Sequence, residues 1–256
     1  MAKVRKKRYS RIAKCICVWG LICFGVYIYC ETEHNVATEI EQLRTTVSSS
    51  AIEQELAELL ENNKEAKEFI KNYPNRTQYM KEKIELSEDF EVGKVPLFMQ
   101  WDMRWGYEDY GESIIGLSGC GPTCLSMAYV YFTEDLTGHP AEMADFCEKK
   151  GYYTSSGTSW ELWTDGVKEL GLSGKELALD EQVIKNALDE GSLIVCSMRP
   201  GDFTNSGHYI LLWGYHQEGF QVHDPNRKSN SEKTWKYDEL HRQIKNLWAI
   251  TRNHQT

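Results

Sequence analysis

Three residues that lie far apart in the chain have the side chains that thiol chemistry requires. Cys120 is flanked by glycines, His208 follows a glycine, and Asp224 comes 16 positions after His208. A thiol nucleophile needs a base to take its proton and a polar group to orient that base. The three residues therefore predict nucleophilic chemistry at a cysteine, provided that the fold brings them together.

The residues around Cys120 predict the start of a helix. Gly119 permits a sharp entry into the helix, and Pro122 is favoured in a first helical turn. The free amides and the helix dipole at such an end stabilise a thiolate. The alternative is that Cys120 is a small buried residue at a helix cap. Cys124, one turn further on, is expected to pack in the core.

A hairpin would bring the histidine and the acid together. The stretch 216–219 predicts a turn between two strands, so His208 and Asp224 should lie at the same end of neighbouring strands. The carboxylate would then hold one imidazole nitrogen while the other faces the thiol. Asn226 is an alternative orienting residue, and His223 should point to the other face of its strand. A histidine at this position could also be an ordinary rim residue.

Gln100 is the fourth candidate. It precedes Trp101 and lies 20 residues before Cys120. Its side-chain amide, together with the backbone amide of Cys120, would form an oxyanion hole. Its position in the sequence does not by itself distinguish it from a surface glutamine.

The order of the predicted elements indicates the fold class. Helical patterns come first in the body of the chain, and strand-like runs follow, as expected for an α+β domain with a mostly antiparallel sheet. The predicted helices are about 120–132, 140–150, 159–170 and 180–190, and the predicted strands are 193–198, 209–215, 220–223 and 247–251.

The first part of the chain has a different character. Residues 1–14 hold seven bases and no acid, and residues 15–30 contain no charged side chain. This order predicts a basic cytoplasmic tail followed by an uncleaved transmembrane signal anchor, with the rest of the protein outside the membrane. A cleaved signal peptide and a buried helix of a soluble protein are the alternatives. Residues 31–94 are expected to form a helical stalk and a charged linker, and residues 95–252 the main domain.

Charge and cysteine usage exclude several classes of function. The formal net charge is −9, and the residues after position 14 carry 22 bases against 38 acids. Such an acidic body argues against nucleic acid as the partner. The cysteine spacing predicts neither a disulfide framework nor a zinc ribbon, and no cofactor is expected. A metal site built from Cys120, His208, His223 and Asp224 would lack any familiar ligand spacing.

These motifs together resemble a known family. The order of Gln100, the run Gly119-Cys120-Gly121-Pro122-Thr123, Gly207-His208-Tyr209 and Asp224-Pro225 resembles the bacteriocin-processing, double-glycine-leader peptidases, which are papain-like cysteine peptidases. The resemblance covers roughly residues 95–252. It implies a papain-like fold with Cys120 as nucleophile, His208 as general base and acid, Asp224 as its orienting residue, and Gln100 as the oxyanion donor.

The expected substrate follows the resemblance only in part. The chain has one predicted span and no nucleotide-binding loop, so it resembles the stand-alone, cell-surface members of Gram-positive bacteria more than the transporter-fused ones. A peptide is the expected substrate, with a peptidoglycan stem peptide as the second choice. Gly119, Gly207 and Trp160 are the expected substrate-binding residues, although Trp160 and its aromatic neighbours Tyr152, Tyr153 and Trp163 could instead form core. An inactive surface binding module on the same fold is the rival function.

Overall fold

The computed structural model describes residues 51–253, which divide into two units between Ala57 and Glu58. The second unit holds every predicted site residue. Of the first unit, the structure describes residues 51–57, the opening turns of α2 (Ala51–Asn62). The predicted basic tail, the predicted anchor at 15–30 and the start of the stalk lie outside the described residues. Within residues 51–253, no helix is both long and apolar enough to span a membrane.

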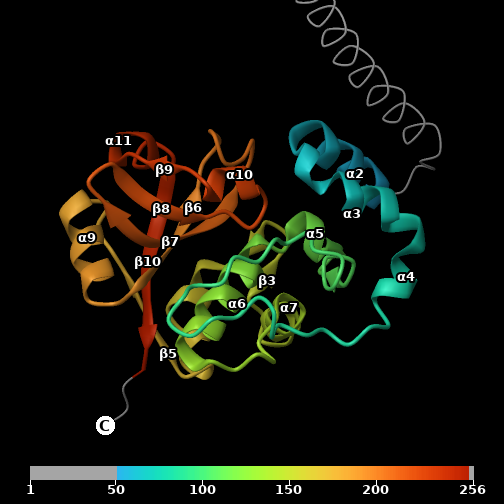
Figure 1. Cartoon of the computed structure of the whole chain (residues 1–256), viewed down its shortest axis with the longest axis horizontal. Helices are drawn as coiled ribbons and strands as arrows, with labels where there is room; N and C mark the ends of the chain where they lie inside the picture. The colour runs from blue at the N-terminus through green and yellow to red at the C-terminus, as the bar shows by residue number, and fades with distance from the viewer. Residues whose placement is uncertain (1–50, 254–256) are drawn as a thin grey trace, which may run out of the picture. The chain divides into compact units, whose positions relative to one another are not determined.

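A six-stranded antiparallel sheet organises the second unit (Figure 1). His208 begins one of its central strands, so the sheet fixes the position of a predicted site residue. In spatial order the strands are β5 (Leu172–Glu176), β10 (Ile244–Arg252), β6 (Leu193–Met198), β7 (His208–His216), β8 (Gly219–His223) and β9 (Thr234–Trp235).

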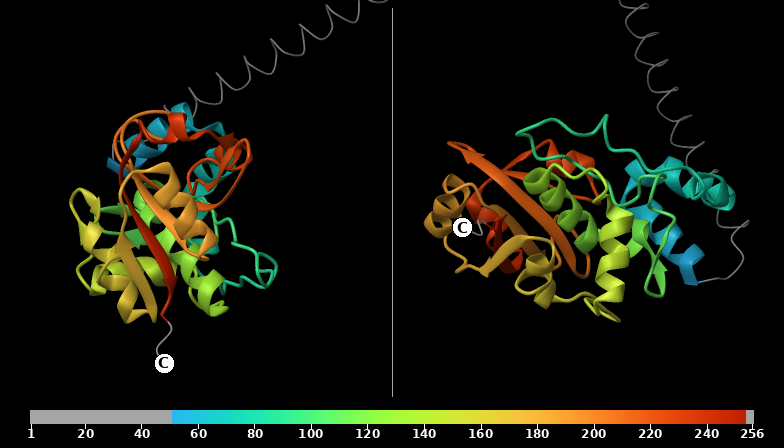
Figure 2. Two further views of the ribbon diagram at one scale, coloured as in Figure 1. Left: turned by 90° about the vertical axis from the view of Figure 1, so that its left-hand side faces the viewer. Right: turned by 90° about the horizontal axis from the view of Figure 1, so that it is seen from below.

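Helices cover both faces of this sheet. Successive side chains of its central strands point to opposite faces, so they pack alternately in two cores. Val195 of β6 packs in the core that includes α6 (Cys120–Thr133) and α7 (Pro140–Lys149). Its neighbour Cys196 packs in a second core, together with Ile184 of α9 (Glu181–Asp189). In the right-hand view of Figure 2, β7 lies between α9 and α6. A strand that is buried on both faces has a nearly continuous apolar sequence, and Leu193–Met198 is an example.

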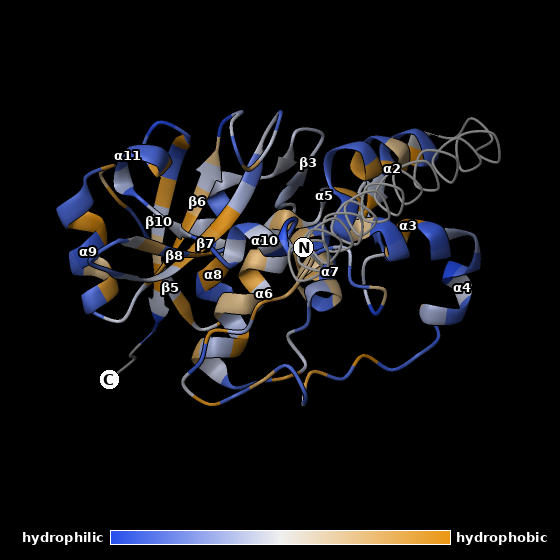
Figure 3. Cartoon of the chain, turned by 45° about the horizontal axis from the view of Figure 1, so that its top comes forward, coloured by the Kyte–Doolittle hydropathy of each residue, from blue (hydrophilic) through white to orange (hydrophobic). Residues whose placement is uncertain are grey.

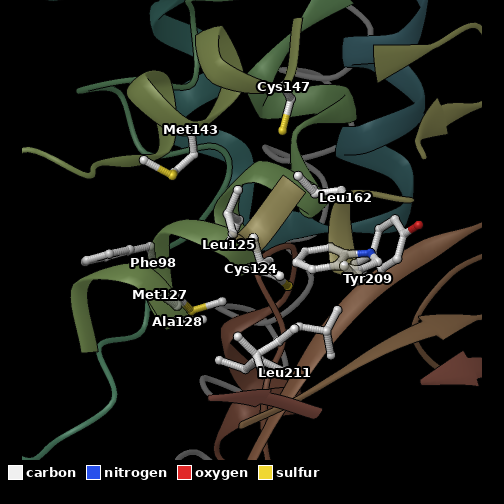
Figure 4. Packing of buried hydrophobic residues seen from close by; sticks show 14 of the residues in the cluster. Phe98, Cys124, Leu125, Met127, Ala128, Met143, Cys147, Leu162, Tyr209 and Leu211 are labelled. Carbon is white, nitrogen blue, oxygen red and sulfur yellow. The ribbon is translucent and has the colours of Figure 1, made fainter. Parts of the chain in front are cut away.

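The helix that begins at Cys120 is the centre of the larger core. Cys124, Leu125, Met127 and Ala128 of α6 are fully buried, and Figure 4 shows them among Leu162, Tyr209, Leu211 and other core side chains. Figure 3 shows the most hydrophobic residues on α6 and on the strands. A helix enclosed in this way cannot shift without disturbing its neighbours, so its first residue is held in place.

The remaining elements are short. They are η1 (Lys64–Ala66), α3 (Lys67–Asn72), η2 (Tyr73–Asn75), α4 (Arg76–Tyr79), β1 (Asp109–Tyr110), β2 (Ser113–Ile114), α5 (Ile115–Ser118), β3 (Tyr153–Thr154), β4 (Gly157–Thr158), η3 (Trp160–Trp163), α8 (Gly166–Glu169), α10 (Lys228–Ser231) and α11 (Tyr237–Leu240). Two of them, α5 and β4, contact α6.

Part of the predicted stalk packs on the body of the second unit. Phe69 of α3 is 2% exposed, and its ring stacks on that of Tyr107 with 4.4 Å between centroids. The Tyr107 hydroxyl donates a hydrogen bond of 2.7 Å to the Phe69 carbonyl. The compact unit therefore begins well before the main domain predicted from residue 95.

The predicted α+β class with an antiparallel sheet is confirmed, and the four predicted strands are present. The predicted helix 159–170 is instead two short pieces, η3 and α8, with Thr164 and Asp165 between them. Strands β5 and β9 were not predicted. β5 is an edge strand with a single apolar residue in five, so it has no alternating pattern to recognise.

Candidate active site

Cys120 is the first residue of α6, as predicted, and its side chain is half-buried. The neighbouring glycines are required by close packing. A Cβ on Gly119 would lie 2.6 Å from the Ile115 carbonyl oxygen, and one on Gly121 would lie 2.3 Å from the Thr158 hydroxyl. The backbone therefore enters α6 in a tight turn after α5, and the Cys120 sulfur lies at the positive end of the helix dipole.

His208 and Asp224 meet at one end of the sheet. His208 begins β7, Asp224 follows the last residue of β8, and Gln217 and Glu218 form the turn that joins the two strands. His208 Nε2 lies 2.8 Å from Asp224 Oδ1. Asp224 is fully buried and His208 is 8% exposed. The hairpin predicted from the sequence thus brings the two residues into hydrogen-bonding distance.

Four hydrogen bonds to its side chain hold the Asp224 carboxylate in place. Besides the bond from His208, its Oδ1 accepts from the backbone amides of Asn226 at 2.8 Å and Arg227 at 3.2 Å. Its Oδ2 accepts from Asn230 Nδ2 at 2.7 Å. A carboxylate held in this way has a fixed orientation and keeps its charge. Asn226 thus acts on Asp224 through its backbone amide and does not replace it.

Asn230 was not singled out from the sequence. It lies in the one-turn helix α10 and is 2% exposed. Its carbonyl accepts from the Trp235 indole at 2.9 Å, which fixes the residue against β9. No periodic or spacing signal marks a residue in so short a helix, and an asparagine after a turn is usually read as part of the loop.

The protonation of the pair follows from burial and from mutual attraction. Burial lowers the pKa of His208, but the Asp224 carboxylate and the Cys120 thiol outweigh it and raise the pKa to about 10. For Asp224 burial raises the pKa, yet His208, Asn230 and the backbone amide of Asn226 together lower it below its ordinary value. The arrangement favours an imidazolium beside a carboxylate.

Cys120 and His208 line the same cleft, and the Cys120 side chain contributes to the raised pKa of His208. Because Asp224 occupies Nε2, Nδ1 is the ring nitrogen that remains for the sulfur. The structure therefore places Cys120 in the same cleft as His208, which is paired with Asp224. This arrangement can deprotonate a thiol and later return the proton to a leaving group.

The other three described cysteines, Cys124, Cys147 and Cys196, differ from Cys120 in their surroundings. All of them are fully buried and form no disulfide. Burial raises the pKa of each of these thiols, that of Cys147 to about 12. A thiol that is buried and protonated is unreactive, so Cys120 is the accessible thiol of the described region. Cys124 packs in the core as predicted.

Gln100 lies in the same cleft wall as Cys120 and is 3% exposed. Its backbone amide donates to the Pro225 carbonyl at 2.7 Å, which ties it to the residue after Asp224. Its Nε2 donates to the Gly116 carbonyl at 3.1 Å. An amide nitrogen carries two hydrogens, so one remains for a bound group.

These residues line a cleft of about 1020 Å³. Gly207 and Trp160, two of the predicted substrate-binding residues, also line it, whereas Gly119, the residue before α6, does not. Trp160 is 41% exposed, but Trp163 is fully buried in the core. Tyr152 and Tyr153, the other two aromatic residues considered, pack against the larger core instead.

His223 points away from the pair, as strand alternation predicted. Its Nε2 lies 3.1 Å from the Val95 carbonyl, and its ring lies 5.4 Å from that of Trp213. Burial lowers its pKa. A site that combined His223 with Cys120, His208 and Asp224 is therefore not formed.

A segment before the main domain braces the loop that follows Asp224. The Glu65 carboxylate accepts from the backbone amides of Lys228 at 2.6 Å and Ser229 at 3.2 Å. The buried Asn63 side chain donates to the Asn226 carbonyl. We call residues 62–65 the N-terminal brace. No sequence signal marks it, because Glu65 is one of many acids in this stretch.

A known protein family matches most of the second unit. The sequence model of the Peptidase_C39 like family matches residues 92–256. Among solved structures, the chain is similar to the peptidase domain of Streptococcus ComA, described as a bi-functional ABC transporter involved in a quorum sensing pathway. The two are 16% identical with a TM-score of 0.39, and the alignment covers 52% of this chain and 89% of the other. No curated protein matches. The family match includes Cys120, His208 and Asp224, and the chain therefore belongs to the Peptidase_C39 like family.

Proposed function

We propose that this chain is a cysteine peptidase in which Cys120 is the nucleophile, His208 the general base and acid, and Asp224 the residue that orients His208. The observation that carries the proposal is the 2.8 Å pair of His208 and Asp224, whose imidazole lines the same open cleft as the half-buried Cys120. Membership of a peptidase family supports the same reaction class.

The reaction follows from these positions. The Cys120 thiolate attacks the carbonyl carbon of a peptide bond, and the carbonyl π electrons move onto oxygen. Gln100 and the backbone amide of Cys120 stabilise that oxyanion. The oxyanion then collapses, the C–N bond breaks, and the His208 imidazolium protonates the leaving amine. Water attacks the resulting thioester while His208 takes its proton, and the acid product leaves as the Cys120 thiolate is restored.

We also propose that this domain acts outside the cell membrane, anchored through residues 15–30. The basic residues 1–14 and the uncharged run that follows them support this topology. The substrate would then be an extracytoplasmic peptide, with stem peptides of peptidoglycan as a specific case.

Replacement of Cys120 should abolish both labelling and catalysis. Cys120→Ala is expected to remove alkylation by iodoacetamide near neutral pH and to lower kcat/KM by more than about 10³-fold, because the nucleophile is lost. Mass spectrometry of the labelled protein and hydrolysis of a peptide library measure the two effects.

The matched control is Cys147→Ala, which removes a fully buried thiol outside the cleft. It should keep both the labelling and the hydrolysis. Undiminished alkylation of Cys120→Ala would contradict the assignment of the nucleophile. A fully inert Cys120 in the wild-type protein would favour an inactive binding module.

Loss of the Gln100 amide should slow the chemical step. Gln100→Leu is expected to reduce kcat by about 10²-fold to 10³-fold, since one oxyanion donor is removed. Alkylation of Cys120 requires no oxyanion and should persist in the variant. A change in KM with kcat intact would show that Gln100 binds substrate and does not stabilise the oxyanion.

The protonation of His208 should depend on Asp224. Its pKa of about 10 lies above the ordinary value, so the stabilisation from the ion pair is complete below about pH 6.5 and is lost as the pH rises through about 10. In Asp224→Asn the carboxylate is gone while burial remains, so the pKa should fall well below about 10. Imidazole NMR titration measures both values.

His223 serves as an internal reference in this titration, because its ring points to the other face. Its pKa should stay low in both proteins. A His208 pKa that is unchanged by Asp224→Asn would show that the carboxylate does not control the imidazole.

The topology can be tested with the same thiol. A membrane-impermeant iodoacetamide should label Cys120 in intact cells, and the Cys120→Ala strain corrects for the other cysteines. Labelling that appears only after the cells are permeabilised would place the domain in the cytoplasm.

A further inference from the structure

The cleft differs in charge from the rest of the molecule. The protein has 38 acids against 29 bases, yet within the described region no Asp or Glu lines the cleft. Two cations, Arg199 and Lys245, do line it, and both are exposed. The walls are otherwise apolar or carry hydroxyl and amide groups. The cleft is therefore a local positive site on an acidic protein, and cleft walls concentrate such a field.

The strand register places both cations next to the catalytic histidine. Met198 of β6 pairs directly with His208 of β7, and Arg199 is the next residue after Met198. On the other side of β6, Met198 pairs with Ile244, which precedes Lys245 in β10. Three adjacent strands thus present His208, Arg199 and Lys245 at one end of the sheet.

Lys245 occupies an irregular position in its strand. The register between β10 and β6 shifts between Ile244 and Asn246, so Lys245 is the extra, unpaired residue of a β-bulge. Bulges re-aim a side chain and occur next to active sites. The Lys245 ammonium lies 5.2 Å from the centre of the Trp160 ring, which forms part of the cleft wall. The bulge therefore directs this cation into the cleft.

Neither cation forms an ion pair with a carboxylate of the described residues. Elsewhere in this region, Arg104, Lys150 and Lys185 each form such a pair at the surface. Asp202, three residues after Arg199, is bound instead by the Gln243 amide at 2.8 Å. The backbone of Arg199 is fixed, because its amide donates to the Gln243 carbonyl at 2.7 Å. The charges of Arg199 and Lys245 are thus available to a ligand.

We propose that Arg199 and Lys245 bind a carboxylate of the substrate, so that the preferred substrate is an acidic peptide. The inference rests on the proposed peptidase function and adds the substrate class. A guanidinium binds a carboxylate through two parallel hydrogen bonds, and the ammonium adds a second charge. Arg199 follows β6, which is next to β7, and Lys245 is in β10, one strand further away. Neighbouring strands lie about 4.8 Å apart and an extended peptide advances about 3.3–3.6 Å per residue, so we expect the carboxylate within about three residues of the scissile bond.

The carboxylate can belong to an Asp or Glu side chain or to the C-terminus of the peptide. Matched substrates distinguish the two sources. One pair differs only in Glu against Gln at each position near the scissile bond, and the other differs only in a free C-terminal acid against an amide. The ratio of kcat/KM within a pair measures the preference for the carboxylate, independently of the rate of the chemical step.

The wild-type protein should favour one acidic member by about tenfold or more, the value expected of a charge-assisted hydrogen bond. The double variant Arg199→Gln/Lys245→Gln should bring that ratio close to one. The double variant Arg199→Glu/Lys245→Glu should invert the preference toward Lys-containing peptides. The Lys233→Gln variant is the matched control, since Lys233 also lies over a tryptophan, Trp235 at 5.5 Å, but outside the cleft. It should keep the wild-type ratio.

Two outcomes would overturn the inference while leaving the peptidase proposal intact. One is efficient hydrolysis with equal rates for the acidic and neutral members, and the other is a preference that survives in the double Gln variant. Thermal melting checks that each variant is folded.

A binding assay separates this inference from the peptidase proposal. The same peptides, carrying a fluorophore, are titrated into Cys120→Ala, which cannot turn over. If the wild-type protein cleaves no peptide but Cys120→Ala still binds the acidic members more tightly, the peptidase proposal fails and the carboxylate site stands. Equal binding of acidic and neutral members would overturn the site.

Discussion

The buried contact between His208 and Asp224 is the constraint on which the rest of the site depends. An imidazole that is 8% exposed and a carboxylate that is fully buried would each be costly alone, so each needs the other. Their contact joins the start of β7 to the end of β8, and the loop after Asp224 turns back to supply amides to the carboxylate. The enclosed helix α6 holds Cys120, its first residue, on the Nδ1 side of the His208 ring. The end of the sheet and the start of α6 therefore determine where His208, Asp224 and Cys120 lie.

Much of this arrangement could be predicted from local sequence. The glycines and the proline around Cys120 restrict the backbone locally, so the helix start was predictable. The turn at Gln217 and Glu218 predicted that His208 and Asp224 lie at the same end of neighbouring strands. The register of β7 and β8 also shifts by one residue between Leu212 and Gly214, and the sequence does not show this shift. The continuous apolar run Leu193–Met198 indicated a strand, and only the structure shows that both of its faces are covered.

Other features could not be predicted, because they depend on residues that are distant in the chain. Asn230 holds Asp224 from a helix of a single turn, and nothing in its neighbours marks it. The bulge at Lys245 arises from the mismatch between β10 and β6, which is a property of the pair of strands and not of either sequence. The absence of acids from the cleft wall in the described region becomes visible only when segments from residues 59 to 245 are brought together. Arg199 and Lys245 are two bases among many in the sequence, and only the fold gives them a shared location.

The N-terminal brace determines which fragments of the chain keep the loop after Asp224 in place. The family match begins at residue 92, whereas Asn63 and Glu65 bind the loop that carries the amides for Asp224. An excised fragment that starts at the family boundary would leave the amides of Lys228 and Ser229 to water and would free that loop to rearrange. The smallest fragment that keeps this loop in place is therefore longer than the family match, and residues 63 and 65 are coupled to Asp224 through the backbone of that loop.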